Sequence, residues 1–165
     1  MTTPRSKGGK HMKKIVIYDS FFGSTKEIAE AIALELECDS IKVQLFNEEV
    51  INNYDIVVLG SPTRKFKPTK EIENLAKKIE GNGTKVALFD TRFDEADELP
   101  KTTLRKIKKH GYSNDKLEMI LRKKHVPIVI YSGEFFVSDK EGPLKEKEIE
   151  KAKEFAVAIR NSLQN

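Results

Sequence analysis

The stretch from Lys13 to Leu36 constrains the fold more than any other part of the chain. An apolar run rich in β-branched residues, Ile15–Tyr18, leads into a loop of small and hydroxyl-bearing residues and then into an amphipathic pattern. In that pattern the apolar residues recur at helical spacing, at Ile28, Ala29, Ile32, Ala33 and Leu36. A buried strand, a tight turn and a helix in this order predict the beginning of an α/β domain.

The loop between this strand and this helix has the composition of an anion site. Unpaired backbone N–H groups and the positive end of the helix dipole converge at such a helix N-terminus. Ser20, Ser24 and Thr25 add hydroxyl donors, and Gly23 lets the backbone approach a ligand closely. The loop contains no lysine, so its donors would be neutral. We interpret it as a phosphate cradle; the alternative is an ordinary turn before a capped helix.

The remainder of the chain alternates strand patterns with helical patterns. Further strands are expected at Ser40–Phe46, Tyr54–Leu59, Thr84–Phe89 and Val126–Tyr131. Helices are expected after Thr69, from Pro100 to His110, over Asn114–Lys124 and from Ile149 to Leu163. This alternation predicts a parallel sheet covered on both faces. Such sheets bind ligands beyond the carboxyl ends of their strands, which makes Ser20–Thr25, Ser61–Lys67 and Asp90–Asp94 the candidate loops.

Composition narrows the class of protein further. Residues 1–11 are polar and precede a second methionine, so we interpret them as an expression-vector leader before a single domain over residues 12–165. Three of the formal +4 charges lie in this leader, which weakens the case for nucleic-acid binding. The single cysteine, Cys38, excludes an internal disulfide and fits a reducing compartment. Without a signal peptide or a spanning apolar run, we expect a cytoplasmic protein.

Three loops together resemble one known family. Ser20–Thr25 resembles the FMN phosphate loop of flavodoxins, and Gly60–Thr63 is similar to the first isoalloxazine loop of flavodoxins and of the flavodoxin module of flavodiiron proteins. Ala87–Arg92 and Phe135–Leu144 resemble segments of small prokaryotic single-domain flavodoxin-like proteins. The resemblance covers Lys13–Leu163, which is nearly all of the chain after the leader.

The resemblance implies a flavodoxin-like three-layer αβα sandwich with a five-stranded parallel sheet in the order 2-1-3-4-5. It also implies an electron carrier that binds FMN at the carboxyl edge, with the flavin supplying the redox chemistry. No catalytic residue and no metal are expected. The expected partner is a redox protein, with no nucleic acid and no membrane insertion, and the chain would be a monomer or a weak homodimer. The FMN-binding residues implied are Ser20, Phe21, Phe22, Gly23, Ser24, Thr25, Ser61, Pro62, Thr63, Arg64, Phe66, Asp90, Thr91, Arg92 and Phe93.

The chain departs from the long-studied flavodoxins around the expected flavin ring. It has no tryptophan, and the loop Asp90–Asp94 has no tyrosine, so stacking on the ring could come from Phe66 or Phe93. Arg64, Lys65 and Arg92 stand where acidic or neutral residues are usual in those flavodoxins. Positive charge near a reduced flavin stabilises it by Coulomb attraction. We therefore expect a reduction potential less negative than that of a typical flavodoxin.

Other interpretations remain open at the level of the sequence. The same flavin site could belong to an FMN-dependent oxidoreductase that acts on a quinone or a porphyrinogen, or the domain could be a flavin-free interaction module. Asp90 is as well suited to bind a neighbouring backbone N–H as to touch a flavin, and Arg92 could be a solvated loop charge. The helical stretch Asn114–Lys124 is long for a connection and is a candidate partner surface.

Overall fold

Five parallel strands form a single sheet in the computed structural model, which describes residues 11–164. The strands are β1 (Lys14–Tyr18), β2 (Asp39–Lys42), β3 (Ile56–Pro62), β4 (Lys85–Phe93) and β5 (Gly133–Val137), in the order β2-β1-β3-β4-β5. All four neighbouring pairs are parallel. The predicted fold and strand order are therefore confirmed, while the predicted leader lies outside the described residues except for its last one.

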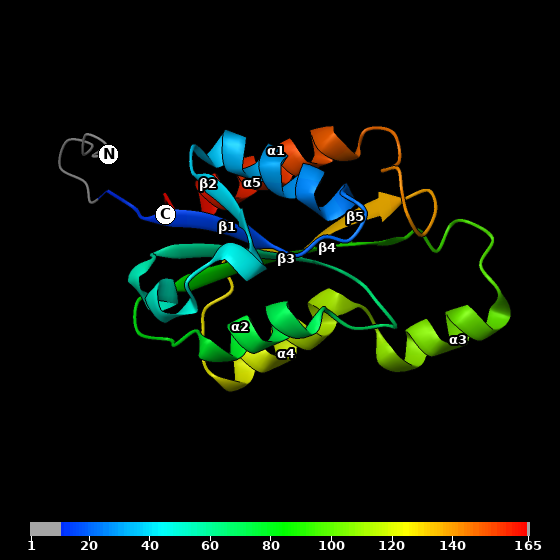
Figure 1. The fold of residues 1–165 in the computed structure, drawn as a ribbon, viewed down its shortest axis with the longest axis horizontal. Coiled ribbons are helices and arrows are strands. Elements are labelled where there is room, and N and C mark those ends of the chain that lie inside the picture. Colours follow the sequence, from blue (N-terminus) through cyan, green and yellow to red (C-terminus); the bar gives the residue numbers. More distant parts are fainter. Residues whose placement is uncertain (1–10, 165) are drawn as a thin grey trace.

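Helices cover both faces of this sheet (Figure 1). The helices α1 (Ser24–Leu36) and α5 (Glu148–Ser162) pack together on one face, and α2 (Lys70–Lys78) and α4 (Ser113–Lys123) pack together on the other. Between β2 and β3 the chain forms only two short 3-10 segments, η1 (Val43–Leu45) and η2 (Glu48–Asn53). The remaining helix, α3 (Lys101–His110), projects past the carboxyl ends of the strands (Figure 1).

The core consists of two apolar clusters, one on each face of the sheet. Successive strand residues point to opposite faces, so Val16 packs with α1 and α5 while Ile15 and Ile17 pack with α2 and α4. In the central strand β3, Ile56–Leu59 is completely buried on both faces. This is the environment that a continuous apolar run in a parallel strand requires. Within residues 11–164 no helix is long and apolar enough to cross a bilayer.

The predicted fifth strand, Val126–Tyr131, is wrong. This run contributes only one bridge to β4, between Ile128 and Val86, and regular pairing resumes where Gly133 meets Phe89. Five chain steps separate Ile128 from Gly133, but only three separate Val86 from Phe89. The two surplus residues must bulge out of the ladder, so the regular strand forms later, over β5.

Two other boundaries differ from the sequence-based expectation, both for reasons of pairing. The strand expected over Ser40–Phe46 ends at Lys42, because its partner strand β1 ends at Tyr18, which pairs with Lys42. Conversely, Asp90–Phe93 was expected to be a loop and instead continues β4. Three of these four residues are polar, but β3 and β5 together provide the segment with ladder partners. The helix predicted over Asn114–Lys124 is confirmed as α4, displaced by one residue.

Candidate functional site

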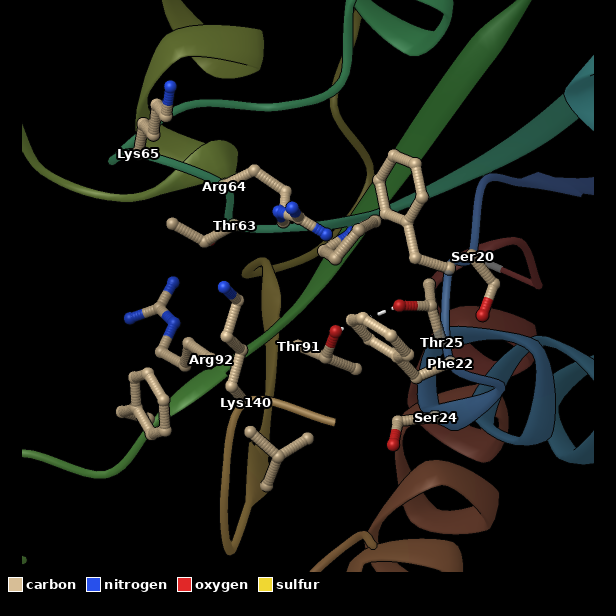
Figure 2. A pocket seen from close by; sticks show the side chains of 14 residues that line it. Ser20, Phe22, Ser24, Thr25, Thr63, Arg64, Lys65, Thr91, Arg92 and Lys140 are labelled. Carbon is tan, nitrogen blue, oxygen red and sulfur yellow. Dashed lines mark hydrogen bonds between the residues drawn. The ribbon is translucent and has the colours of Figure 1, made fainter. Parts of the chain in front are cut away.

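A pocket of about 240 Å³ opens at the carboxyl edge of the sheet (Figure 2). Its walls come from the loop before α1, the residues around the end of β3, the end of β4 and the turn after β5. The three loops that the sequence singled out therefore do meet in space. The lining residues are Ser20, Phe21, Phe22, Ser24, Thr25, Pro62, Thr63, Arg64, Lys65, Thr91, Arg92, Phe93, Val137 and Lys140.

The N-terminus of α1 opens into this pocket without a side-chain cap. Its N-cap residue, Gly23, has a φ of 102°, a left-handed conformation that glycine adopts without strain, and makes no side-chain cap hydrogen bond. The first helical hydrogen bond runs from the N–H of Glu27 to the carbonyl of Gly23. The N–H groups of residues 24–26 precede it and have no acceptor inside the helix. Ser24 and Thr25 are buried at this point, so an anion in the pocket would face donors shielded from water.

Two contacts hold this loop in place. The hydroxyl of Thr25 lies 2.8 Å from the hydroxyl of Thr91 on β4, and both side chains are buried. On the other side, Gly142 packs so closely that a Cβ added to it would lie 2.9 Å from the Ser24 hydroxyl. The turn after β5 therefore packs against the loop Ser20–Thr25, which we call the anion loop. The same turn carries Lys140, whose side chain extends into the pocket (Figure 2).

Cationic side chains dominate the electrostatics of the pocket. Arg64, Lys65, Arg92 and Lys140 line it, and no aspartate or glutamate does among the described residues. The guanidinium of Arg64 lies 4.5 Å from the ring centre of Phe21, within cation–π distance. Since like charges gathered on one concave wall raise the local potential, the pocket favours an anionic ligand.

Asp90 and Arg92 form a buried ion pair behind the pocket wall. The Nε and Nη2 atoms of Arg92 each donate to the Asp90 carboxylate at 2.8 Å, and the backbone N–H of Asn114 donates to the same carboxylate at 3.0 Å. This two-pronged geometry is that of an ionised pair. Burial raises the pKa of the Asp90 carboxyl, and the bonds from Arg92 and Asn114 oppose that shift. Burial also disfavours the charge of Arg92, but its bonds to Asp90 outweigh this and raise the pKa of the guanidinium.

The ring of Tyr112 packs against the guanidinium of Arg92. The central carbon of the guanidinium lies 3.6 Å from the ring centre of Tyr112, whose hydroxyl donates to the Glu95 carboxylate at 2.6 Å. Burial and the neighbouring Glu95 raise the pKa of Tyr112, which keeps its phenol neutral. Glu134 lies 3.5 Å from Arg92 and adds a second, more exposed carboxylate. Arg92 is thus held rigidly in the wall of the pocket.

Most of the residues implied by the flavodoxin resemblance line the pocket, but four do not. Gly23 shapes the anion loop from behind it, and Ser61 is buried, where its hydroxyl accepts the N–H of Thr69 and donates to the Pro62 carbonyl. Asp90 is turned away toward Arg92 and the start of α4. Phe66 lies outside, with its ring 6.0 Å from that of His110. Of the two aromatic candidates for stacking, Phe93 is the one in the pocket wall.

Three lining residues were not among those predicted: Lys65, Val137 and Lys140. From the sequence, the charge of Lys65 is expected near the flavin ring, but Lys65 is not among the FMN-binding residues that the resemblance implies. Val137 and Lys140 follow from the true position of β5, since they lie at the carboxyl end of that strand and in the turn beyond it. Placing the strand at Val126–Tyr131 moved the carboxyl edge away from them.

Comparison with known proteins agrees with this architecture. Oxidised flavodoxin 1 of Bacillus cereus superposes with a TM-score of 0.67 at 19% identity, over 90% of this chain and 97% of that one. A flavodoxin from the domain Archaea gives a TM-score of 0.64 at 20% identity, over 93% and 100% of the two chains. Rubredoxin oxygen:oxidoreductase of Desulfovibrio gigas gives 0.66 at 17% identity, over 92% of this chain and 36% of that larger one.

The structural matches show the fold, and sequence comparison identifies the family. An uncharacterized protein of Methanocaldococcus jannaschii is 32% identical over 81 residues, which are 48% of this chain and 54% of that protein. The match thus spans about half the length of this curated relative. The sequence model of the flavodoxin domain matches residues 15–132, well over half of the chain. The protein therefore belongs to the flavodoxin domain family.

Proposed function

We propose that the protein binds FMN in the pocket at the carboxyl edge and carries electrons to or from a partner protein. The observation that carries this proposal is the uncapped N-terminus of α1, which opens into a pocket lined by four cations and, among the described residues, no carboxylate. A phosphate ester suits such a site because it accepts several hydrogen bonds and carries negative charge.

The donor set divides into a phosphate end and a ring end. At the phosphate end, the N–H groups of residues 24–26 and the hydroxyls of Ser24 and Thr25 would hold the anion. At the ring end, the flat ligand would meet Pro62, Thr63 and Phe93, with Arg92 fixed beside them. Aromatic and apolar walls around a few placed polar groups are what a planar heterocycle requires. The residues present therefore fit FMN.

The cations give the site a definite redox preference. When bound, FMN supplies one- and two-electron chemistry, and its reduction adds negative charge to the ring. Arg64 lines the wall and makes no ion pair among the described residues, whereas the charge of Arg92 is already paired with Asp90. Positive charges held near the ring favour the added electrons by direct Coulomb attraction. The expected reduction potential is therefore less negative than that of a flavodoxin with an acidic rim.

The lining also favours a carrier over an enzyme. Among the described residues, the wall contains hydroxyl, apolar and permanently cationic side chains, with no histidine or carboxylate poised to transfer a proton. A quinone- or porphyrinogen-directed oxidoreductase would use the same flavin, so turnover distinguishes the two functions. Reduction of a quinone by NAD(P)H would favour the enzyme, whereas reduction of the flavin only through a separate reductase would favour the carrier.

The deciding experiment is a fluorescence titration of the flavin-stripped protein with FMN, with riboflavin as the control. Riboflavin has the same ring and lacks the phosphate, so the difference between the two affinities isolates the anion loop. We expect saturable quenching of FMN fluorescence and much weaker binding of riboflavin. Equal affinities would refute the phosphate assignment, and no binding of either flavin would refute the proposed function.

A further inference from the structure

A second cavity, of about 650 Å³, lies between the residues that follow β3 and the helices α3 and α4. We call it the lysine groove. Five lysines and one histidine line it, against a single carboxylate among the described residues. The lining residues are Lys65, Phe66, Lys67, Lys106, Lys109, His110, Asp115, Lys116 and Met119.

Most of this positive charge is not neutralised within the chain. In the described residues, only Lys116 of the five lysines makes an ion pair, 3.6 Å from Glu73, which also pairs with Lys77. The one carboxylate of the groove, on Asp115, accepts the backbone N–H of Tyr112 at 2.7 Å. Four ammonium groups therefore face the groove with no anionic partner, although facing cations repel one another.

Two apolar side chains, those of Phe66 and Met119, line the groove together with the lysines. The rings of Phe66 and His110 lie 6.0 Å apart, and Met119 presents an exposed side chain, 56% accessible. Phe66 stands at the tip of a tight turn closed by two backbone hydrogen bonds between Arg64 and Lys67. At this tip Lys65 and Phe66 have φ angles of 51° and 67°, in the left-handed region that favours glycine. The chain thus keeps a cation and an aromatic ring at positions where neither is conformationally favoured.

The groove adjoins the pocket at the carboxyl edge, because Lys65 lines both cavities. A molecule seated in the groove would therefore lie beside the mouth of the pocket. From this juxtaposition we propose that the lysine groove docks an acidic, partly apolar segment of the protein that exchanges electrons with this chain. The electron exchange rests on the proposed function, whereas the docking rests on the groove alone.

The lining favours a protein segment over a phosphate or a nucleic acid. A helix N-terminus would favour a single phosphate, but the N–H groups of Ser113 and Asn114 at the start of α4 already donate to Thr63 and Asp90. A single-stranded nucleic acid would use aromatic platforms along a continuous basic track. The groove offers instead one phenylalanine and one methionine among five lysines. This arrangement complements an apolar side chain flanked by carboxylates.

The experiment measures binding of a short fluorescein-labelled peptide, rich in glutamate with interspersed leucines, to the full chain by fluorescence anisotropy. The groove variant is Lys106→Glu with Lys109→Glu. The matched control is Lys101→Glu with Lys108→Glu, which changes the charge of the same helix equally at exposed positions that do not line the groove. A peptide with glutamine in place of glutamate tests the need for carboxylates, and a labelled single-stranded oligodeoxythymidine tests for nucleic acid.

We expect the groove variant to weaken peptide binding by roughly tenfold or more and the control by about twofold, because screening limits the distant charges. Equal losses in the two variants, undiminished binding of the glutamine peptide, or no saturable binding would overturn the proposal. It would also fall if the oligonucleotide, and not the acidic peptide, depended on Lys106 and Lys109.

An FMN titration of the same variants separates the two proposals. Both variants leave the lining of the pocket untouched, so both should bind FMN like the parent protein. If the protein binds no FMN but the peptide still depends on the groove, the proposed function fails and the docking stands. If FMN binds but the groove variant does not weaken peptide binding more than the control does, the docking proposal fails and the proposed function stands.

Discussion

Replacing Asp90 by asparagine tests the buried ion pair behind the pocket wall. The change keeps the shape of the side chain, removes its charge and leaves Arg92 one of the two oxygens that it contacts at 2.8 Å. The side chains of Asp90 and Arg92 are 0% and 8% exposed, so water cannot readily replace the lost charge. Breaking such a buried pair from one side costs about 3–5 kcal/mol. Glu134 at 3.5 Å and the Tyr112 ring still compensate part of the charge of Arg92. We therefore expect a loss of about 3 kcal/mol, at the low end of that range.

Equilibrium unfolding in urea measures this loss as a difference in the free energy of unfolding. A second variant, Arg92→Met in the Asp90→Asn background, removes the stranded charge. Because a buried pair replaced by neutral groups costs far less than a broken one, this double variant should be more stable than the sum of the two single losses by about 2 kcal/mol or more. The exposed pair of Lys78 and Glu48 is the control, since Glu48→Gln should cost less than about 1 kcal/mol.

The outcome that refutes the reasoning is a small effect. A loss below about 1 kcal/mol for Asp90→Asn, similar to that of an exposed pair, would mean that Arg92 reaches water without its partner. Additive single losses would mean that the two side chains do not act as a pair.

Three further predictions concern individual side chains. Lys140→Gln should weaken FMN binding by roughly three- to tenfold and leave riboflavin binding unchanged, because one charge near the phosphate is lost; equal changes for both flavins would contradict this. Burial acts against the charge of Glu73, but its lysine neighbours outweigh it and lower its pKa below 4.5. Its contribution to stability is therefore complete above pH 4.5 and lost as the pH falls through the folded-state pKa, so the cost of Glu73→Gln should fade in acid unfolding curves. Burial raises the pKa of Cys38 to about 11, with Lys14 opposing, so native protein at neutral pH should react with iodoacetamide far more slowly than urea-unfolded protein.

The residue patterns alone were sufficient for a parallel sheet covered on both faces, because its central elements carry unambiguous local signals, whereas the strand order was implied by the resemblance to flavodoxins. The apolar runs that became β1 and β3 are buried on both faces, and the helical stripe of α1 packs on the sheet as its spacing required. The fifth strand could not be located in the same way. Two neighbouring segments were suitable for pairing with β4, and the choice between them depends on register against Phe89, which periodicity does not encode.

The candidate site was predictable in outline and not in detail, for a similar reason. Loops at the carboxyl edge of a parallel sheet must converge, so Ser20–Thr25 and the end of β3 were found. Which way a side chain turns is a tertiary question. Asp90 directly precedes two lining residues on β4, Thr91 and Arg92, yet its carboxylate faces Arg92 and α4. Lys140 enters from a turn whose position depended on the strand that was misplaced.

The turn from Arg64 to Lys67 would couple the affinity of the pocket for its ligand to the affinity of the lysine groove for a partner. Lys65 lines both cavities, so an anion bound in the pocket and carboxylates bound in the groove would compete for one ammonium group. Thermodynamic linkage would make this competition reciprocal, so each ligand would lower the affinity of the other by the same factor. Negative charge added to the pocket by reduction would strengthen the attraction between the pocket and Lys65. Electron uptake would then weaken the binding of an acidic partner and promote its release.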